Sequence, residues 1–238
     1  MCIRDSYRCY TLCANLELRL PEADQIALDR QRRLTQSSLY VLIDAGEDEQ
    51  AFEETVTKLI HAGVDILQLR DNSVDDRTLL SRARLGAKIS RESGSLFIMN
   101  DRADLAAAAD TDGVHVGQEE LPVAETRQIV GPSRLIGVST HSIEQARDAV
   151  TGGANYIGCG PVFAGQTKTF DSYVGTSFLS EVVAEIEIPA FAIGGSVFTN
   201  VGEVVAAGLR RIAVTGAVRD ADDPAAAVTA LRQNLDQN

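Results

Sequence analysis

The feature that most constrains this chain is a regular alternation of short apolar runs with amphipathic stretches, which begins at Leu39. The apolar runs are aliphatic or β-branched and end at polar residues or Gly, as parallel strands buried on both faces do. The stretches between them have apolar residues at helical spacing, and those at 51–63 and 74–94 end in Gly. The predicted strands are Leu39–Asp44, Ile66–Arg70, Leu96–Asn100, Val114–Gly117, Leu135–Ser139, Tyr156–Gly160, Ala190–Gly194 and Arg211–Thr215.

Strands that alternate with helices form either an open doubly wound sheet or a closed barrel. An open sheet usually has fewer strands and a Gly-rich nucleotide turn after the first one, but here the first strand runs into IDAGEDEQ without GxGxxG. Polar residues instead follow nearly every strand, and in a barrel all of these ends meet at one mouth. We therefore predict an α/β fold, a (β/α)₈ TIM barrel with a short N-terminal helical extension. Residues 1–38 would be the extension or linker, a remnant of an extra helical segment in one interpretation, and 39–238 the barrel domain.

Composition limits the classes of partner. A net charge of −12 argues against general nucleic-acid binding, because a phosphate backbone requires a basic surface. No apolar run approaches the roughly 18 residues that span a bilayer. Hydrophobic residues make up 45% of the chain and aromatic ones only 5%, without Trp, so the core should be aliphatic. We expect a cytoplasmic protein that binds small phosphorylated substrates, with no nucleic acid and no membrane; homo-oligomerisation stays open.

Two small-residue turns indicate a phosphate site. AIGGS follows the seventh strand and VTGAV the eighth, and backbone N–H groups in such turns can approach an anion closely. Barrels frequently build a phosphate site from these two loops. The alternative is that the glycines only permit tight turns.

Acidic and basic side chains follow the middle strands. Asp101 after the third strand and Glu120 after the fourth suit Mg²⁺, which takes one or two carboxylates plus substrate phosphate oxygens. Asp101 could instead be the N-cap of the next helix. Arg70 closes the second strand, and Lys168 lies in the long loop after the sixth, which suits a segment that folds over substrate.

The remaining reactive side chains are better explained as structural. For His115 and His141 we favour structural roles, and for Cys159 a buried thiol. No Ser–His–Asp order or Cys–His pair indicates a covalent nucleophile, and no Cys/His cluster has zinc spacing.

Taken together, the motifs resemble the thiamine-phosphate synthase family from about Leu39 to the C-terminus. The resemblance rests on the order of seven motifs: QLRD (68–71), NDRADLA (100–106), DGVHVGQEE (112–120), GVSTHS (137–142), GCGPVF with QTKT (158–169), AIGG (192–195) and VTGAV (214–218). It implies a transferase that joins 4-amino-2-methyl-5-hydroxymethylpyrimidine diphosphate to a thiazole phosphate, with a carboxylated thiazole left open. The products would be thiamine phosphate and pyrophosphate.

The resemblance also implies roles for individual residues. Asp101 and Glu120 would bind Mg²⁺, and Arg70, Lys168 and Ser139 would be catalytic, because Mg²⁺ and the cations stabilise the charge of departing pyrophosphate. The substrate-binding set divides into three groups. Gln68, Arg70, Asn100, Ser139 and Lys168 would hold the pyrimidine diphosphate; Thr167, Gly195, Thr215 and Gly216 the thiazole phosphate; Leu69, Asp71, Asn72, Gly165 and Gln166 complete the set.

Three positions depart from the family pattern. Asn72 stands where the family usually has Lys, which removes one cation from the diphosphate site unless Arg102 or another cation compensates. Glu120 replaces the usual Asp, and Gly165 replaces a Thr or Ser. Two alternatives are a thiazole tautomerase-like barrel, which needs no diphosphate or magnesium site, and a non-catalytic paralogue that binds thiazole phosphate. Retention of Arg70, Asp101, Glu120 and Lys168 favours the synthase.

Overall fold

Eight parallel strands close into a barrel in the computed structural model, which describes residues 21–164, 173–195 and 200–237. Each strand pairs with the next in the chain and β8 pairs with β1, which confirms the predicted (β/α)₈ barrel. The observed strands lie within the predicted ones or extend one residue beyond them. They are β1 (Leu39–Ile43), β2 (Ile66–Leu69), β3 (Leu96–Asn100), β4 (Gly113–Val116), β5 (Leu135–Thr140), β6 (Tyr156–Cys159), β7 (Ala190–Ile193) and β8 (Ile212–Val214).

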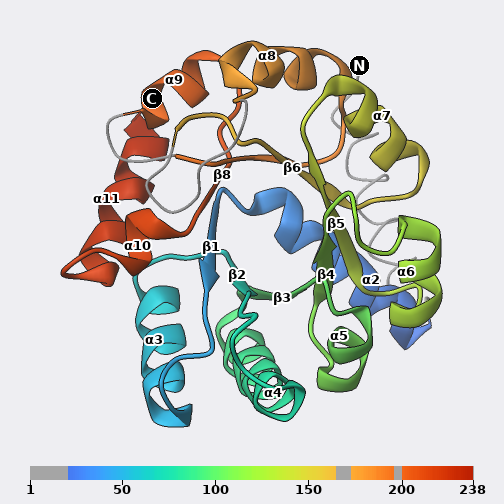
Figure 1. Cartoon of the computed structure of the whole chain (residues 1–238), viewed down its shortest axis with the longest axis vertical. Coiled ribbons are helices and arrows are strands. Elements are labelled where there is room, and N and C mark those ends of the chain that lie inside the picture. Colours follow the sequence, from blue (N-terminus) through green and yellow to red (C-terminus); the bar gives the residue numbers. More distant parts are fainter. Residues whose placement is uncertain (1–20, 165–172, 196–199, 238) are drawn as a thin grey trace, which may run out of the picture.

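Helices surround the strands as an outer ring (Figure 1). Several begin at a capping side chain, such as α3 at Asp48 and α4 at Asp75, whose carboxylates accept hydrogen bonds from the first backbone N–H groups. The helices are α2 (Glu22–Gln36), α3 (Glu49–His61), α4 (Asp76–Ser93), α5 (Ala103–Ala109), α6 (Val123–Val130), α7 (Ile143–Thr151), α8 (Gly175–Glu185), α9 (Val201–Ala206), α10 (Gly216–Arg219) and α11 (Pro224–Gln237).

The two-residue period of each strand divides its side chains between two layers. Outward residues such as Val41, Leu67 and Ile136 are fully buried beneath the helices, in a mainly aliphatic core. Inward residues fill the barrel, and here the expectation of an aliphatic core is wrong in part: Tyr156 and Phe191 pack at its centre. The barrel interior is therefore aliphatic at the amino ends of the strands, which we call the barrel floor, and aromatic just below the mouth.

A glycine makes room for that aromatic centre. Gly137 is an inward residue of β5, and a Cβ atom added there would lie 2.1 Å from the Tyr156 ring. Since no side chain tolerates such a contact, β5 needs a glycine where the Tyr156 ring packs against its backbone.

Helix α2 lies across the floor of the barrel, behind the strands in Figure 1. Leu34 is fully buried and packs with the interior residues Ile66 and Leu96. The Arg30 Nε atom donates to the Asp112 carboxylate at 2.9 Å, and both side chains are buried. The helix is thus anchored to the start of β4. The division of the chain at residue 38 stays a prediction.

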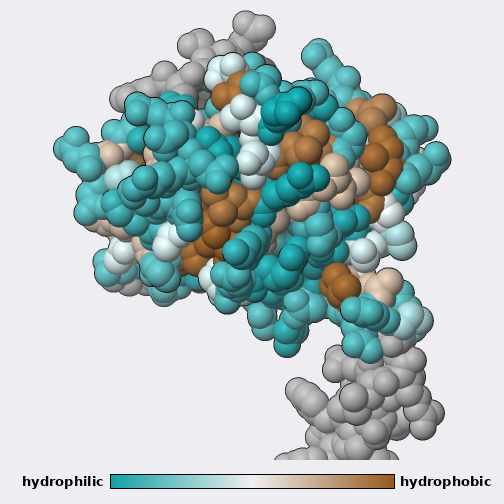
Figure 2. Space-filling model, turned by 90° about the horizontal axis from the view of Figure 1, so that it is seen from below, coloured by the Kyte–Doolittle hydropathy of each residue, from teal (hydrophilic) through white to brown (hydrophobic). Residues whose placement is uncertain are grey.

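The outer face in Figure 2 is mostly hydrophilic, with hydrophobic patches between hydrophilic rows, as expected for amphipathic helices. Among the described helices, none is both long and apolar enough to cross a membrane.

Candidate functional site

A cavity of about 130 Å³ opens at the carboxyl ends of the strands. This volume is close to that of cavities that accept one six-membered ring. The cavity has an aromatic floor and a polar rim, because the inward residues of successive strands meet there. The lining residues are Tyr40, Leu42, Gln68, Arg70, Asn100, Asp101, His115, Gly117, Glu120, Ser139, Tyr156, Gly158, Phe191, Ile193 and Ala213.

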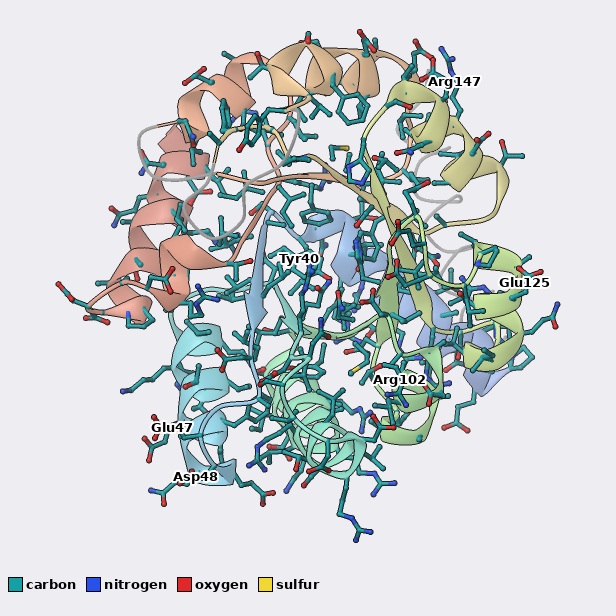
Figure 3. The ribbon with its side chains drawn as sticks, viewed as in Figure 1. Tyr40, Glu47, Asp48, Arg102, Glu125 and Arg147 are labelled. Atoms are coloured by element: carbon teal, nitrogen blue, oxygen red, sulfur yellow. The ribbon has the colours of Figure 1, made fainter. Side chains whose placement is uncertain are left out.

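The cavity floor is built from rings that pack edge to face. Tyr40 points into the centre of the barrel (Figure 3), and its ring centroid lies 5.5 Å from that of Phe191. Tyr156 lies 5.8 Å from Phe191 and 5.5 Å from His115. Such a floor suits a flat ligand, whose faces and edges can pack against these rings.

The polar atoms of the floor are uncharged near neutral pH. Burial raises the pKa of both Tyr40 and Tyr156 above the usual value of a phenol. Burial, and then the positive charge of Arg70, lowers the pKa of His115 to about 4. Two phenols and one neutral imidazole therefore face the ligand.

One atom of the floor lacks a partner. The Gln68 Nε2 atom donates to the Tyr40 hydroxyl at 2.6 Å, whereas its Oε1 atom is buried without a hydrogen bond to any described residue. A buried carbonyl oxygen is destabilising unless a donor reaches it. Gln68 is thus ready to accept a hydrogen bond from a ligand N–H or O–H group.

Ser139 and His115 form a pair that the sequence analysis did not expect. Their Oγ and Nε2 atoms lie 3.0 Å apart, as in a nucleophile and its base. The Nδ1 atom of His115, however, faces the Tyr156 hydroxyl at 3.3 Å rather than a carboxylate, and the low pKa makes the imidazole a weak base. This pair is suited to hydrogen bonding rather than to activating a nucleophile.

Asp101 and Glu120 both line the rim, near enough for their charges to interact. The pKa of Asp101 is raised by burial and by the negative charge of Glu120, which outweigh Arg70 and a 2.6 Å hydrogen bond from Asn100. Two carboxylates that repel one another in this way favour a cation between them.

The backbone also distinguishes Asp101 from a helix cap, which was the alternative interpretation. Asp101 has φ of +59°, which is uncommon for a residue other than Gly, and its side chain accepts from Asn100. The N-cap of α5 is Arg102, which makes no capping hydrogen bond. The N-cap interpretation is therefore wrong.

The rim fits Mg²⁺ with substrate, rather than a metal held by protein alone. The described residues contain no group of three or more His, Cys, Asp or Glu that could hold a metal ion. Mg²⁺ commonly takes one or two carboxylates and completes its shell with water and phosphate oxygens.

Among the residues that the structure describes, Arg70 is the cation that lines the rim. Its side chain lines the cavity and makes no hydrogen bond or ion pair with a described residue. Arg102 is not a substitute for the missing Lys, because its guanidinium is paired with Asp76 at 2.6 Å and with Asp104 at 2.7 Å. Figure 3 shows Arg102 beside α5, away from the centre of the barrel. Asn72 is exposed and does not line the cavity.

Two predicted binding residues take other positions. The Leu69 side chain is fully buried among outward residues, so it packs beneath the helices and cannot contact a ligand in the cavity. Burial alone would raise the pKa of Asp71, but hydrogen bonds from Ser73 and Ala45 outweigh it and hold that pKa below its usual range. Asp71 joins the loops after β1 and β2.

The predicted monophosphate loops lie after β7 and β8. Gly194 and Gly195 have φ of +95° and +63°, and a Cβ atom on Gly195 would lie 2.6 Å from the carbonyl oxygens of Phe163 and Ala164. Only Gly fits that turn. Thr215 precedes α10, which begins at Gly216, and its side chain does not cap that helix. The predicted residues Gly165, Gln166, Thr167 and Lys168 lie outside the described residues.

The sequence analysis missed Tyr40, Tyr156 and Phe191 as site residues. The available signal was the two-residue period of the strands. Gln68 and Ser139 point inward, and so do their partners on the neighbouring strands and every second residue from those partners. The expectation for Cys159 is confirmed: it is a buried thiol whose pKa burial raises to about 12. His141 contacts the carbonyl oxygen of Gly160, and its structural role stays a prediction.

Comparison with known proteins decides the family. Residues 39–218 match the protein family described as thiamine monophosphate synthase. This chain belongs to that family. A thiamine-phosphate synthase from Rhodopirellula baltica is 48% identical over 236 residues, which cover 97% of this chain and 62% of the relative. A thiamine-phosphate synthase from a Nostoc species is 37% identical, with 94% of this chain and 60% of the relative covered.

This member of the thiamine monophosphate synthase family therefore spans about 60% of the length of the curated relatives it matches. Among solved structures, it is similar to a thiamine phosphate pyrophosphorylase from Pyrococcus furiosus. The TM-score is 0.76 at 32% identity, and the match covers 87% of this chain and 98% of the other. A 3-hexulose-6-phosphate synthase shares the fold alone, with a TM-score of 0.59 at 21% identity.

Proposed function

We propose that this chain transfers the pyrimidinylmethyl group of 4-amino-2-methyl-5-hydroxymethylpyrimidine diphosphate to a thiazole phosphate, with release of pyrophosphate. The observation that carries the proposal is the division of one cavity into two parts. Its floor is ring-sized and aromatic, with an acceptor in need of a donor at Gln68, and its rim carries Arg70 and two carboxylates that repel one another.

The binding mode follows from that division. The pyrimidine ring lies among Tyr40, Tyr156 and His115, and its amino group donates to the Gln68 Oε1 atom. The diphosphate then reaches the rim, where Arg70 binds its oxygens and Asp101 and Glu120 hold Mg²⁺. When bound, Mg²⁺ supplies positive charge that stabilises the pyrophosphate as it leaves.

The residues of the chain act by position and charge. Departure of pyrophosphate increases negative charge at the rim. Arg70 and the Ser139 hydroxyl therefore bind the diphosphate more strongly as it leaves than in the intact substrate. The substitution is dissociative: the carbon–oxygen bond to pyrophosphate breaks, the methylene carbon gains positive charge and is then captured by the thiazole nitrogen, and no bond to the protein forms. The glycine turns after β7 and β8 hold the thiazole phosphate.

The thiazole tautomerase alternative is less well supported by the same residues. A tautomerase needs neither a diphosphate site nor a metal site, yet Arg70, Asp101 and Glu120 all line the cavity. A non-catalytic paralogue that binds thiazole phosphate would have no reason to keep two carboxylates that repel one another. The cytoplasmic location stays a prediction.

The direct test is release of pyrophosphate by purified protein with Mg²⁺ and the two substrates. We expect release only when both substrates are present, accompanied by thiamine phosphate. Folded protein that yields no thiamine phosphate would overturn the proposal.

A pair of adjacent glutamates tests the metal site. Both are exposed, but Glu120 lines the cavity and Glu119 does not. We expect Glu120→Gln to lower kcat about 10- to 100-fold and to raise the Mg²⁺ concentration for half-maximal activity, with Glu119→Gln close to the unchanged protein. Equal effects of the two substitutions would mean that the metal lies elsewhere.

A further inference from the structure

An unbroken series of hydrogen bonds crosses the cavity floor from Gln68 to Ser139. The Gln68 Nε2 atom lies 2.6 Å from the Tyr40 hydroxyl, which lies 3.0 Å from the Tyr156 hydroxyl. That hydroxyl lies 3.3 Å from His115 Nδ1, and His115 Nε2 lies 3.0 Å from the Ser139 Oγ atom. We call these five side chains the floor relay.

Each interior member of the floor relay has one hydrogen to donate along it. Both tyrosines are protonated phenols. Each ring nitrogen of His115 faces a hydroxyl rather than a carboxylate, so the imidazole is neutral, with a single N–H group. The imidazole accepts at one nitrogen and donates at the other, and a tyrosine that accepted from both neighbours would leave its own hydroxyl hydrogen without an acceptor in the series. Either all four hydrogen bonds run from Gln68 towards Ser139, or all four run the opposite way.

The two directions present different groups to a ligand. In one direction, from Gln68 to Ser139, which we call outward, Gln68 donates through its amide nitrogen and His115 carries its hydrogen on Nε2. The Ser139 hydroxyl is then left to donate at the rim. In the inward direction, Ser139 donates to His115 and Tyr40 donates to the Gln68 oxygen, so Gln68 offers N–H groups to the ligand instead. Reversal rotates the hydroxyls and the amide and moves the imidazole proton between ring nitrogens, with no change of charge.

We infer that a ligand N–H group at the Gln68 Oε1 atom sets the floor relay in the outward direction and so makes Ser139 a hydrogen-bond donor at the rim. The inference rests on the proposed function for the identity of the ligand. Gln68 Oε1 is buried without a partner in the described part of the chain, so the outward direction is completed when a ligand donates there. Recognition of the ring is thereby coupled to the donor that faces the leaving group.

On this inference Tyr40, Tyr156 and His115 are positioning residues. They act on the reaction through Ser139, since the hydroxyl of a serine rotates freely unless a neighbour fixes it. Gly137 is part of the same device, because it leaves the space through which the Tyr156 ring reaches His115.

The position of the imidazole proton is a direct readout. The chain has three histidines, so protein labelled with ¹⁵N-histidine gives few signals, and His115 is assigned by the signals lost in His115→Gln. The probe is 4-amino-5-hydroxymethyl-2-methylpyrimidine, and the matched probe has hydrogen in place of the amino group. We expect the amino probe alone to shift His115 to the Nε2–H form. An equal response to both probes, or no response to either at saturating concentration, would overturn the inference.

Removal of one hydroxyl breaks the floor relay without removing a ring. We expect Tyr156→Phe to abolish the His115 response and to lower kcat about 10- to 100-fold, with the KM for thiazole phosphate unchanged. Tyr40→Phe is the second variant, with the same expectation. Tyr173→Phe, outside the cavity lining, is the matched control and keeps the His115 response.

The measurements separate this inference from the proposed function. A His115 response to the amino probe, with no thiamine phosphate formed under any condition, would keep the floor relay and overturn the transferase. Normal turnover in Tyr156→Phe and Tyr40→Phe, with an unchanged His115 response, would overturn the floor relay and keep the transferase.

Discussion

At the scale of single residues, His115 shows how the barrel changes ordinary chemistry. The imidazole lies between Tyr156 and Ser139, and burial, followed by the charge of Arg70, lowers its pKa to about 4. The usual value for His is about 6.5. The residue is consequently neutral near neutral pH, which suits the directional link that we infer for it rather than an acid or base.

That shift predicts a pH-dependent stability. Between the folded pKa of about 4 and the unfolded value near 6.5, the unfolded chain binds more protons, so the free energy of unfolding falls as pH falls. The loss attributable to His115 is about 2 kcal/mol between about pH 7.5 and about pH 5. Urea unfolding at both pH values, compared between the natural chain and His115→Gln, measures it.

The comparison isolates one group, because other titrating side chains contribute equally to both proteins. His61→Gln on the exposed end of α3 is the control, and it should keep the full pH dependence. If His115→Gln kept it as well, the low pKa would not belong to this residue.

A second prediction at this scale concerns Asn72. The residue is exposed beside Asp71, whose carboxylate is held by Ser73 and Ala45. We expect Asn72→Lys to lower the KM for the pyrimidine diphosphate about 5- to 10-fold, because a lysine there adds a cation near the rim. Steady-state kinetics measure the change, with Asn72→Gln as the uncharged control. Equal KM values for the two variants would show that charge at this position does not reach the diphosphate.

At the scale of elements, helix α2 closes the barrel floor and packs into the interior; it is not a loosely attached extension. Leu34 is fully buried against the interior, while Leu28 on the same helix is 49% exposed. We expect Leu34→Ala to reduce the free energy of unfolding by about 2–5 kcal/mol and Leu28→Ala by less than about 0.5 kcal/mol. Urea denaturation followed by circular dichroism compares them, and similar losses would mean that α2 does not seal the barrel.

The elements themselves were largely predictable from the sequence. Strands buried on both faces leave continuous apolar runs, and polar residues mark their ends, so all eight strands were placed correctly. The alternation within each strand also separates inward Gln68 from outward Leu69, although the family motif includes both. What the pattern does not contain is which distant side chains meet.

Two examples make this clear. Arg30 binds Asp112, and Tyr40 contacts Tyr156, although each pair is far apart in the chain. Such contacts depend on how the closed barrel sets the stagger of its strands, which no local window of sequence specifies. The docking of α2 and the floor relay therefore became visible only in the structure.

At the scale of the whole molecule, the candidate site exists only when the barrel is closed. Its floor takes Tyr40 from the first strand and Phe191 from the seventh, and its rim takes residues that follow the strands between them. Folding and site formation are thus one event, and any loss of barrel stability reduces the fraction of molecules with a complete cavity.

The same view predicts the outcome of truncation. A chain that begins at Leu39 lacks α2, which exposes the floor contacts of Leu34 and leaves the buried Asp112 without Arg30. Loss of the Leu34 packing alone costs about 2–5 kcal/mol, while Asp112 keeps its hydrogen bond from the Phe97 N–H group and is opened to water. A chain that begins at Pro21 keeps all of these contacts.

The chain from Pro21 is therefore the reference for the chain from Leu39. We expect the chain from Leu39 to unfold at a much lower urea concentration or to aggregate, since the lost packing is a large part of the stability of an ordinary domain. Urea denaturation and the two-substrate assay measure both truncations. An unchanged midpoint for the chain from Leu39 would instead make 39–238 a self-sufficient barrel, with α2 an extension packed on its surface.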